Sequence, residues 1–579
     1  MAQNLPETAL VSGIRSQAGE TFRAARDLLL AHREDYAEAT KRFTWPDLEH
    51  FNYALDHLDA VATAPETADR TALWLVDPDG VDHRWSYGDL REQSNALANR
   101  LRAAGIRRGS RVLLALGNQH ELWLSLIALM KLGAVAVPTT TLADATELGQ
   151  RIAVAHCEAV IARPEEAARY QEWTHLVRLT PGGAPGWLDL TEPGHAPTFT
   201  ADAPTRASDP LFLYYTSGTT ARAKLVEHTH ASYTIGHLTT MAWTGVRPGD
   251  VHLNISSPGW GKHAWSSFFA PFHAEATVFM VAYQRFDPRA LMHQMQRCGV
   301  SSFCAPPTVW RMLIQADLTE LTTPPTSVVG AGEPLNPEVI ARVQDAWGVT
   351  IRDGYGQTET TLQVGNFPGQ PVKPGSMGLP APGYAIALVD GETGKPVTEP
   401  GAPGEICLDL AHRPLGLTPG YADDAERTQE VMREGYYRTG DIAYADEDGY
   451  LFYVGRADDV FKASDYRISP FDLESAMLEH PLVRECAVIP SPDPMRLAVP
   501  KAFVTLVDGA AATEAMAREL FAHSRAVLSP YKRVRRIEFA PALPKTISEK
   551  IRRVELRRAD AQRYAELAEG EVPTGEFRG

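Results

Sequence analysis

The chain has 579 residues, of which 44% are apolar and 22% charged, and its formal net charge is −16. A chain of this length is too long for one compact core, so two or more domains are expected. The negative charge argues against non-specific binding to nucleic acid or to an anionic membrane, because both favour a basic face, but it leaves room for a local basic pocket.

The N-terminus and the cysteines favour a cytoplasmic protein. The opening residues MAQNLPETALVSG lack the basic segment and apolar core of a signal peptide, and no apolar run approaches the roughly 20 residues that span a bilayer. The cysteines form no CxxC pair, so neither a disulfide framework nor a zinc site is suggested. We expect five small buried residues in a reducing compartment: Cys157, Cys298, Cys304, Cys407 and Cys486.

The first half of the chain alternates between strand and helix patterns. Residues 1–50 look helical and charged, as in an extension packed on the body. From Arg111 the runs RVLLALG, HELWLSLIALMKL, AVAVPT, ELGQRIAVAH and EAVIAR read as β-α-β-α-β, which is typical of a mostly parallel sheet covered by helices. After a Pro/Gly-rich stretch near 181–209 the alternation resumes with runs such as VHLNIS, TVFMVAY, VSSFCAP and SVVGAG, so two α/β layers are expected.

The last third of the chain changes character twice. Between about 375 and 455, short alternating runs with turn signals predict a small β-rich subdomain. After GRADD (455–459) the pattern is that of a compact α+β unit behind a polar linker. We therefore predict an α/β protein with a helical extension (1–50), a large N-terminal domain (51–457) and a small mobile α+β C-terminal domain (458–579), with a hinge near Asp458.

The segment YYTSGTTARAKLVEH, from Tyr214 to His228, raises the question of a phosphate site. It fails the Walker pattern GxxxxGK[ST], because Ala223 replaces the second glycine and Leu225 follows the lysine. A turn of small hydroxyl residues is usually only a turn, yet its backbone N–H groups and hydroxyls suit phosphate oxygens, with a lysine expected at the start of the next helix. The candidate residues are Thr216, Ser217, Gly218, Thr219, Thr220 and Lys224.

Four later stretches offer complementary groups. DGYGQTETT (353–361) has an aromatic ring to cover a flat base, a hydroxyl, and a carboxylate able to hold Mg²⁺. YRTGDIAYADEDGYLFYVGR (437–456) contains Asp441, an acceptor suited to ribose hydroxyls. GRADDVFKASDYRISPFDLE (455–474) brings Asp458 and Arg467, and LPKTISEKIRR (543–553) places Lys550 near the C-terminus.

Together these five motifs, in this order, resemble the adenylate-forming superfamily of acyl-CoA synthetases, peptide-synthetase adenylation domains and luciferases. The resemblance runs from about residue 45 to 560 and is closest to stand-alone acyl-CoA synthetases, because no carrier domain follows. It implies ATP and Mg²⁺ as cofactors and CoA as the expected co-substrate.

The resemblance also assigns roles to individual residues. The loop Thr216–Lys224 would hold the β- and γ-phosphates, Thr358 would contact the α-phosphate, and Glu359 would help to bind the metal. Lys550 would bridge the substrate carboxylate and the α-phosphate, and Arg467 would reach the phosphates or ribose. The adenine and ribose residues would be Gly332, Glu333, Pro334, Asp353, Tyr355, Gly356, Asp441 and Arg456.

The acid-binding site is expected in SPGWGKHAWSSFFAPF (257–272), where Trp260, Lys262, His263 and Trp265 are candidates for its walls or gate. Lys262 could pair with an anionic or polar substrate. Plainer interpretations stand beside these: aromatic core packing for Trp265 and Phe268, a solvated charge for Lys550, a turn aspartate for Asp441, a helix cap for Glu359, and structural ion pairs for Arg456.

Three departures from the family pattern matter, and the third bears on the acceptor. The phosphate loop has Ala221 and Ala223 around Arg222 where many relatives have Gly-x-Pro-Lys, and Ser548-Glu549-Lys550 replaces Ser-Gly-Lys. Asp465 stands where many thioester-forming relatives have a glycine, in the loop that faces the acceptor tunnel. A carboxylate there could narrow that tunnel or change which nucleophile enters.

We therefore expect an AMP-forming ligase that activates a small or medium acid as its adenylate, releases pyrophosphate and transfers the acyl group to CoA. The alternatives are capture of the adenylate by an amine, by amide formation or by nitrite activation for diazotisation of an aryl amine, and a catalytically silent nucleotide-binding homologue. The partners expected are small molecules, with neither nucleic acid nor membrane insertion.

Overall fold

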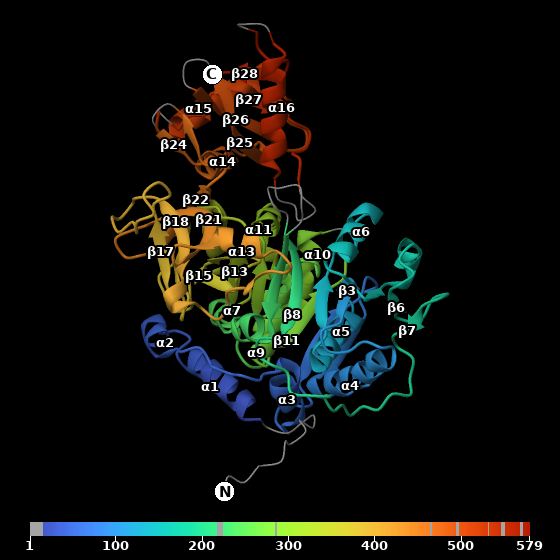
Figure 1. The fold of residues 1–579 in the computed structure, drawn as a ribbon. Coiled ribbons are helices and arrows are strands. Elements are labelled where there is room, and N and C mark those ends of the chain that lie inside the picture. Colours follow the sequence, from blue (N-terminus) through green and yellow to red (C-terminus); the bar gives the residue numbers. More distant parts are fainter. Residues whose placement is uncertain are drawn as a thin grey trace. The chain divides into compact units, whose positions relative to one another are not determined.

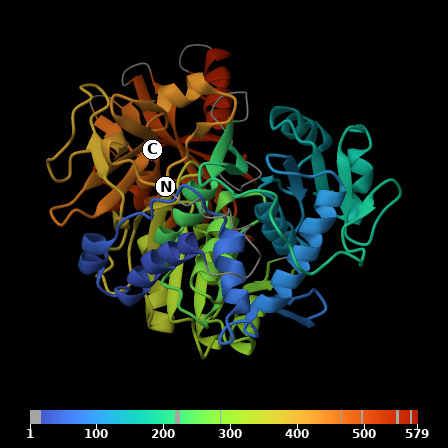
Figure 2. The same ribbon diagram turned by 60° about the horizontal axis from the view of Figure 1, so that its bottom comes forward.

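The computed structural model describes residues 16–216, 224–283, 286–463, 466–493, 497–530, 532–545, 551–567 and 571–579. By their internal contacts the residues fall into two compact units, shown in Figures 1 and 2. The N-terminal unit comprises Met1–Ala385 and Leu408–Tyr437, and the C-terminal unit comprises Ile386–Cys407 and Arg438–Gly579.

The N-terminal extension contains two helices, α1 (Gln17–Ala31) and α2 (Tyr36–Arg42). Ser16 caps α1 by accepting a hydrogen bond from the Gly19 backbone N–H. Arg26 of α1 pairs with Glu275 at 2.6 Å, and the Arg33 guanidinium donates to the Gly245 carbonyl at 3.0 Å. The extension is thus fastened to the body of the N-terminal unit, where Figure 2 shows it in blue.

The first sheet has eight strands in the order β19-β9-β8-β4-β3-β5-β6-β7. Strand β3 (Arg111–Ala115) pairs in parallel with both β4 (Val135–Pro138) and β5 (Ala159–Ala162), so the predicted β-α-β-α-β order is confirmed. Its crossover helices are α5 (His120–Leu132), which ends at Gly133 with φ of 69°, and α6 (Ala145–Val154). The remaining strands are β6 (Val177–Thr180), β7 (Leu188–Asp189), β8 (Pro210–Thr216), β9 (Lys224–Thr229) and β19 (Gly420–Tyr421).

One local prediction is wrong. Lys224 begins strand β9 rather than a helix, and it lies opposite Thr216 in the antiparallel β8–β9 pair. The next two residues, Leu225 and Val226, are buried and pair with β8, and helical structure begins only at His230. Pairing with β8 therefore overrides the expectation that the phosphate loop leads into a helix.

The second sheet of the N-terminal unit has the order β16-β15-β14-β13-β12-β10-β11-β1-β2 and is parallel from β14 to β1. It supplies the second predicted α/β layer. Three of its helices begin with proline, a favoured first helical residue: α10 (Pro288–Arg297), α11 (Pro307–Leu313) and α12 (Pro337–Trp347). Its strands are β1 (Thr71–Val76), β2 (Asp82–Ser86), β10 (Val251–Asn254), β11 (Thr277–Val281), β12 (Ser302–Ala305), β13 (Ser327–Ala331), β14 (Arg352–Gly356), β15 (Leu362–Gly365) and β16 (Ser376–Pro380).

The remaining elements complete the N-terminal unit. Helix α4 (Tyr87–Ala103) carries a capping box between Ser86 and Asp89 and packs beside α5, as Figure 1 shows. The others are α3 (Asp59–Thr63), α7 (Leu238–Thr244), α8 (Gly261–Ala264), α9 (Ala270–His273), α13 (Ala425–Val431), β20 (Met432–Arg433), the π-helical segments Ala54–Leu58, His230–Ile235 and Trp265–Phe269, and the 3₁₀ segments Pro164–Tyr170, Leu318–Glu320 and Leu410–His412.

The C-terminal unit contains two β structures. Strands β17 (Ile386–Val389), β18 (Gly404–Asp409), β21 (Tyr436–Ala445) and β22 (Leu451–Arg456) are neighbours in that order and correspond to the predicted β-rich segment. A four-stranded sheet, β25-β26-β27-β28, packs with two helices around one apolar core and with a third helix around a smaller apolar cluster. These elements are β23 (Phe461–Ala463), β24 (Tyr466–Ile468), α14 (Pro470–Leu478), β25 (Val483–Asp493), β26 (Leu497–Leu506), α15 (Glu514–Val527), β27 (Arg536–Phe539), α16 (Arg553–Ala565) and β28 (Glu576–Arg578).

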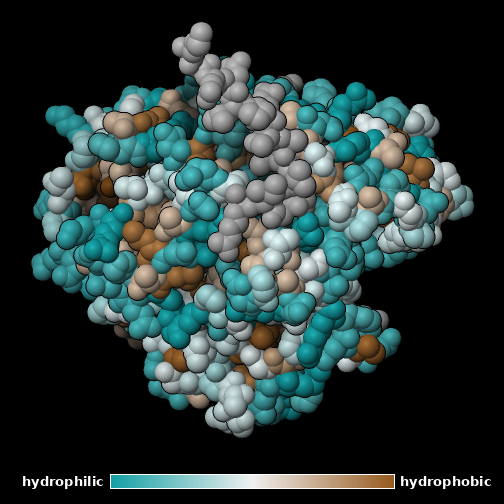
Figure 3. Space-filling view, turned by 90° about the horizontal axis from the view of Figure 1, so that it is seen from below, coloured by the Kyte–Doolittle hydropathy of each residue, from teal (hydrophilic) through white to brown (hydrophobic). Residues whose placement is uncertain are grey.

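Burial agrees with the composition. All five cysteines are buried and none forms a disulfide, as expected of small core residues. On the face in Figure 3, apolar residues form small groups among hydrophilic ones, which is ordinary for a protein surface. No helix in the described part of the chain is long and apolar enough to cross a membrane.

Candidate functional site

The predicted phosphate loop joins strands β8 and β9. Thr216 ends β8 and Lys224 begins β9, so the loop is anchored on paired strands of the first sheet. The Thr216 hydroxyl is buried and has no hydrogen-bond partner among the described residues, which suits a group that awaits a ligand oxygen. Ser217, Gly218, Thr219 and Thr220, with Ala221, Arg222 and Ala223, lie outside the described residues.

Tyr421 links the phosphate-loop lysine to the predicted metal ligand. Its hydroxyl donates to Glu359 Oε1 at 2.8 Å, and the Lys224 Nζ lies 5.9 Å from the centre of its ring. Strand β19 brings Tyr421 there by pairing with β9, in the register Tyr421 to Val226. A cation and a carboxylate that lie far apart in sequence thus meet around one aromatic ring, an arrangement suited to a phosphate and its metal ion.

Thr358 and Glu359 lie in the turn between β14 and β15, whose backbone is held from two sides. His228 Nε2 donates to the Thr358 carbonyl at 2.7 Å, and the Thr418 N–H donates to the Glu359 carbonyl at 2.8 Å. Burial lowers the pKa of His228 to about 4, so this ring is neutral at pH 7 and its Nε2 carries the proton. The turn is therefore a fixed platform. No helix among the described residues has Glu359 as a cap.

The predicted adenine residues follow β13 and end β14. Gly332 has φ of 109°, which favours glycine, and Glu333 pairs with Arg311 at 3.4 Å. Tyr355 and Gly356 end β14, and Pro334 follows Glu333. Gly356 has no room for a side chain, since a Cβ would lie 2.4 Å from Trp265.

Asp353 and Lys262 are two ionisable residues near this edge that influence each other electrostatically. Burial raises the pKa of Asp353 to about 7, while hydrogen bonds from the Gly354 and Leu335 backbone and the positive charge of Lys262 oppose the rise. Burial lowers the pKa of Lys262, and the Glu333 and Asp353 carboxylates oppose that shift. The Lys262 ammonium donates to the Ala331 carbonyl at 3.0 Å. Lys262 therefore faces the end of β13.

The other substrate-pocket candidates are mainly packed side chains. His263 is buried, donates from Nε2 to Asn118 Oδ1 at 2.9 Å and lies against Trp123. Burial lowers the His263 pKa to about 3, so it is neutral. Trp265 is buried against Gly356, the residue that follows Tyr355 in the sequence. Trp260 is half-buried and precedes α8. Core packing and a wall beside β14 are thus compatible roles for Trp265.

The ribose candidates lie in the C-terminal unit. Asp441 is buried and accepts a hydrogen bond from the Tyr453 hydroxyl at 3.1 Å, and Arg456 lies 3.4 Å from the same carboxylate oxygen. Arg456 also donates to the Thr439 carbonyl and approaches Asp458 at 3.6 Å. The orientation of the Asp441 carboxylate is therefore fixed by Tyr453 and Arg456, and Arg456 makes further structural contacts beside it.

The predicted hinge and the other predicted residues of positions 458–579 are only partly covered by the described residues. The Asp458 carbonyl accepts from Arg557 at 3.0 Å, and its hinge role stays a prediction. Lys550 and Asp465, with Ser548 and Glu549, lie outside the described residues, as does the side chain of Arg467. Sequence reasoning missed Tyr421, Tyr453 and His228. Their partners are distant in sequence, except for Tyr453, whose strand pairs with that of Asp441.

Comparisons with known proteins define the class. A family model for AMP-binding enzymes matches residues 61–422, and one for the AMP-binding enzyme C-terminal domain matches residues 472–550. The chain belongs to the AMP-binding enzyme family, within the adenylate-forming superfamily, and is an AMP-forming acid ligase. The acyl-CoA ligases of this family use ATP, Mg²⁺ and CoA.

Individual relatives narrow the class to acyl-CoA ligases. The chain is 42% identical to 4-hydroxybutyrate–CoA ligase 1 of Metallosphaera sedula over 92% of this chain and 94% of that protein. It is 38% identical to the mitochondrial acyl-coenzyme A synthetase ACSM3 of Rattus norvegicus, over 88% and 91%. The solved structure of anthranilate CoA ligase AuaEII with anthranoyl-AMP matches with a TM-score of 0.80 at 29% identity, covering 89% of this chain and 98% of that one. The predicted fold class is confirmed.

Proposed function

We propose that the chain converts a small or medium acid and ATP into an acyl adenylate and pyrophosphate, and then transfers the acyl group to CoA with release of AMP. The observation that carries this proposal is the cluster of Lys224, Tyr421 and Glu359 at the end of the predicted phosphate loop. Two relatives are named as CoA ligases of 4-hydroxybutyrate and anthranilate, which supports a small or medium acid.

The chemistry requires two anions to approach each other. The substrate carboxylate attacks the α-phosphorus, the bond to the β-phosphate oxygen breaks, and pyrophosphate leaves. Lys224 would neutralise charge on the leaving phosphates, and Lys550 would bridge the carboxylate and the α-phosphate. Thr358 would hold the α-phosphate from the fixed turn after β14. Preorganised groups of this kind contribute because they need not reorganise when charge develops.

Glu359 fits a role in binding magnesium. No group of three or more His, Cys, Asp or Glu side chains in the described part of the chain could hold a metal by itself. Mg²⁺ at nucleotide sites is usually held by one or two carboxylates together with substrate phosphates, so one oriented glutamate is enough. When bound there, the ion would neutralise phosphate charge.

Acid-dependent pyrophosphate release tests the first step. A panel of acids is supplied with ATP and Mg²⁺, and CoA and amines are then added separately to detect thioester or amide. Lys550→Ala should lower the adenylation rate by roughly 10²–10³ while sparing attack of CoA on a preformed adenylate. Equal losses in both half-reactions would remove Lys550 from this role.

The acceptor is tested through Asp465. With CoA as acceptor, Asp465→Gly leaves thioester formation unchanged or faster. A variant that slows capture by an amine but spares pyrophosphate release would instead point to Asp465 as a general base for an amine. A wild-type enzyme that adenylates an acid but forms no thioester contradicts the proposed acceptor.

A further inference from the structure

The turn that carries Glu359 is anchored through its backbone at several points. Besides the bonds from His228 to Thr358 and from Thr418 to Glu359, the Thr361 N–H donates to the Gly416 carbonyl at 3.1 Å. None of these bonds touches the carboxylate. These bonds fix the backbone position of Glu359 but do not determine the orientation of its carboxylate group.

Tyr421 provides that orientation. Among the described residues, its hydroxyl is the hydrogen-bond donor to the Glu359 carboxylate, at 2.8 Å. Tyr421 is itself buried, and its backbone is fixed by the strand pairing with β9 and by a hydrogen bond from its N–H to Thr428 Oγ1 at 3.0 Å. A fixed donor on a buried ring selects one orientation of the glutamate side chain.

The same residue contacts the phosphate-loop lysine. Lys224 lies over the Tyr421 ring and begins the strand that pairs with β19. Strand β19 thus spans the two halves of the phosphate site, the lysine on β9 and the carboxylate on the β14–β15 turn. The hydroxyl serves the carboxylate and the ring face serves the lysine, so the two contacts can be removed separately.

We propose that Tyr421 is a positioning residue that orients Glu359 for the magnesium ion of MgATP. This inference rests on the proposed role of Glu359. Hydrogen-bonded partners of metal-binding carboxylates typically contribute 10- to 100-fold to metal affinity, because they hold the ligand in its binding orientation. The effect should therefore appear in binding of metal-loaded nucleotide and be absent from binding of metal-free nucleotide.

The informative variant is Tyr421→Phe, which removes the hydroxyl and keeps the ring over Lys224. Calorimetric titrations with MgATP, and with ATP in EDTA, are carried out on the full chain without acid or CoA. We expect Kd for MgATP to rise about tenfold and Kd for metal-free ATP to change less than about twofold. Glu359→Gln should show the same pattern, with a loss at least as large.

Tyr384→Phe is the matched control. The Tyr384 hydroxyl bonds Thr361 Oγ1 at 2.8 Å in the same turn, is equally buried, and does not touch Glu359. If loss of any buried hydroxyl loosened the turn, both tyrosine variants would weaken MgATP alike, and the inference would be overturned. We expect Tyr384→Phe to leave both dissociation constants within about twofold of the wild type.

The Tyr421 and Glu359 variants together distinguish failure of the inference about Tyr421 from failure of the metal role proposed for Glu359. If Glu359→Gln weakens MgATP while Tyr421→Phe does not, or if Tyr421→Phe weakens both forms of ATP equally, Tyr421 does not orient the metal ligand. If Glu359→Gln leaves MgATP binding unchanged, the metal role in the proposed function fails, and the inference about Tyr421 fails with it.

Discussion

The two units bury polar side chains in different ways. Seven histidines of the N-terminal unit are at most 2% exposed, namely His57, His228, His230, His237, His252, His263 and His273. Burial lowers the pKa of each of them, to about 4 for His228 and His252 and to about 3 for His230, His263 and His273. These side chains are buried as neutral rings, and several lie against aromatic residues, as His273 does beside Tyr53, to which it is hydrogen-bonded at 2.8 Å.

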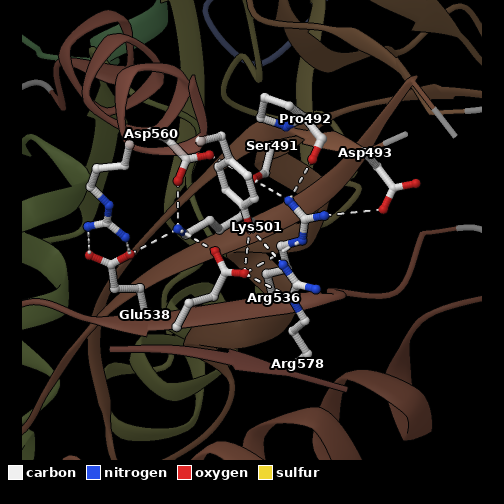
Figure 4. A network of polar contacts seen from close by, with 11 residues as sticks. Ser491, Pro492, Asp493, Lys501, Arg536, Glu538, Asp560 and Arg578 are labelled. Carbon is white, nitrogen blue, oxygen red and sulfur yellow. Dashed lines mark hydrogen bonds and ion pairs between the residues drawn. The ribbon is translucent and has the colours of Figure 1, made fainter. Parts of the chain in front are cut away.

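The N-terminal unit also buries charge, in the ion pair of Lys131 with Asp59 at 2.8 Å, but the C-terminal sheet gathers several buried charges into one network. Lys501, which is completely buried, contacts Asp560 at 2.6 Å, Glu576 at 2.7 Å and Glu538 at 2.9 Å. Figure 4 shows this network continuing through Arg536 to Ser491 and Asp493. Asp560 and Glu576 come from α16 and β28, which lie beyond the match to the C-terminal family model.

The difference between buried neutral histidines and a buried network of charges shows which change in conditions or sequence each unit does not tolerate. A neutral imidazole can be buried with one or two hydrogen bonds, provided that the pH stays above its ordinary pKa. A buried charge needs an opposite charge at every pH, because removing one partner leaves the other uncompensated. The large unit is therefore sensitive to acid, and the small one to loss of any member of its network.

Acidification gives the largest expected effect. The histidines bind protons more readily unfolded than folded, so their stabilising effect is present above pH 6.5 and is lost as the pH falls toward 4. At pH 5, each histidine with a folded pKa of about 4 lowers the free energy of unfolding by about 2 kcal/mol relative to its value above pH 6.5. Urea unfolding followed by tryptophan fluorescence measures this loss, because all 11 tryptophans lie in the N-terminal unit.

In the same acid titration, the C-terminal unit should lose stability at a lower pH than the N-terminal unit. Glu538 and Glu576 have lowered pKa values because of their cationic partners, so their stabilising effect is lost only below about pH 4.5. Hydrogen exchange of β25–β28 should thus stay protected at pH 5. Loss of protection in both units over one pH range would contradict the comparison.

Lys501→Met should give the next largest effect, a loss of about 3–5 kcal/mol in the stability of the C-terminal unit, because the carboxylates around it lose their cation. Hydrogen exchange in β25–β28 reports this loss, while the tryptophan unfolding midpoint should not move. A loss under about 1 kcal/mol would show that the carboxylates accommodate protons or water at little cost.

His230→Leu should give a smaller, pH-dependent effect. Neither ring nitrogen of His230 has a hydrogen-bond partner among the described residues, so an apolar side chain of similar size loses no bond there. We expect stability within about 1 kcal/mol of the wild type at pH 8, and about 2 kcal/mol higher at pH 5. An unchanged pH profile would show that His230 is not one of the acid-sensitive groups.

Arg484→Gln should have the smallest effect. Arg484 pairs with fully exposed Asp508 at 3.1 Å in the same unit as Lys501. Exposed ion pairs contribute about 0–1 kcal/mol, so hydrogen exchange and thermal unfolding should change little. An effect comparable with that of Lys501→Met would mean that burial is not what distinguishes the network.

The sequence by itself determined the alternation of strands and helices and the motifs around Thr216, Glu359 and Asp441, because these depend on neighbours within a few residues. It also indicated the adenylate-forming family. Local signals were misleading at Lys224, where pairing with β8 produced a strand in place of the expected helix. Pairing partners are set by the sheet and not by the turn that precedes them.

Only the tertiary structure decided which distant residues meet. Tyr421 reaches Glu359 across 62 positions, and Lys501 meets Glu576 across 75, and neither pair carries a local pattern. The sequence likewise showed histidines without showing that they would be buried and neutral. Such facts follow from how strands from separate stretches pair and how close packing excludes water, since both bring together side chains that the chain order keeps apart.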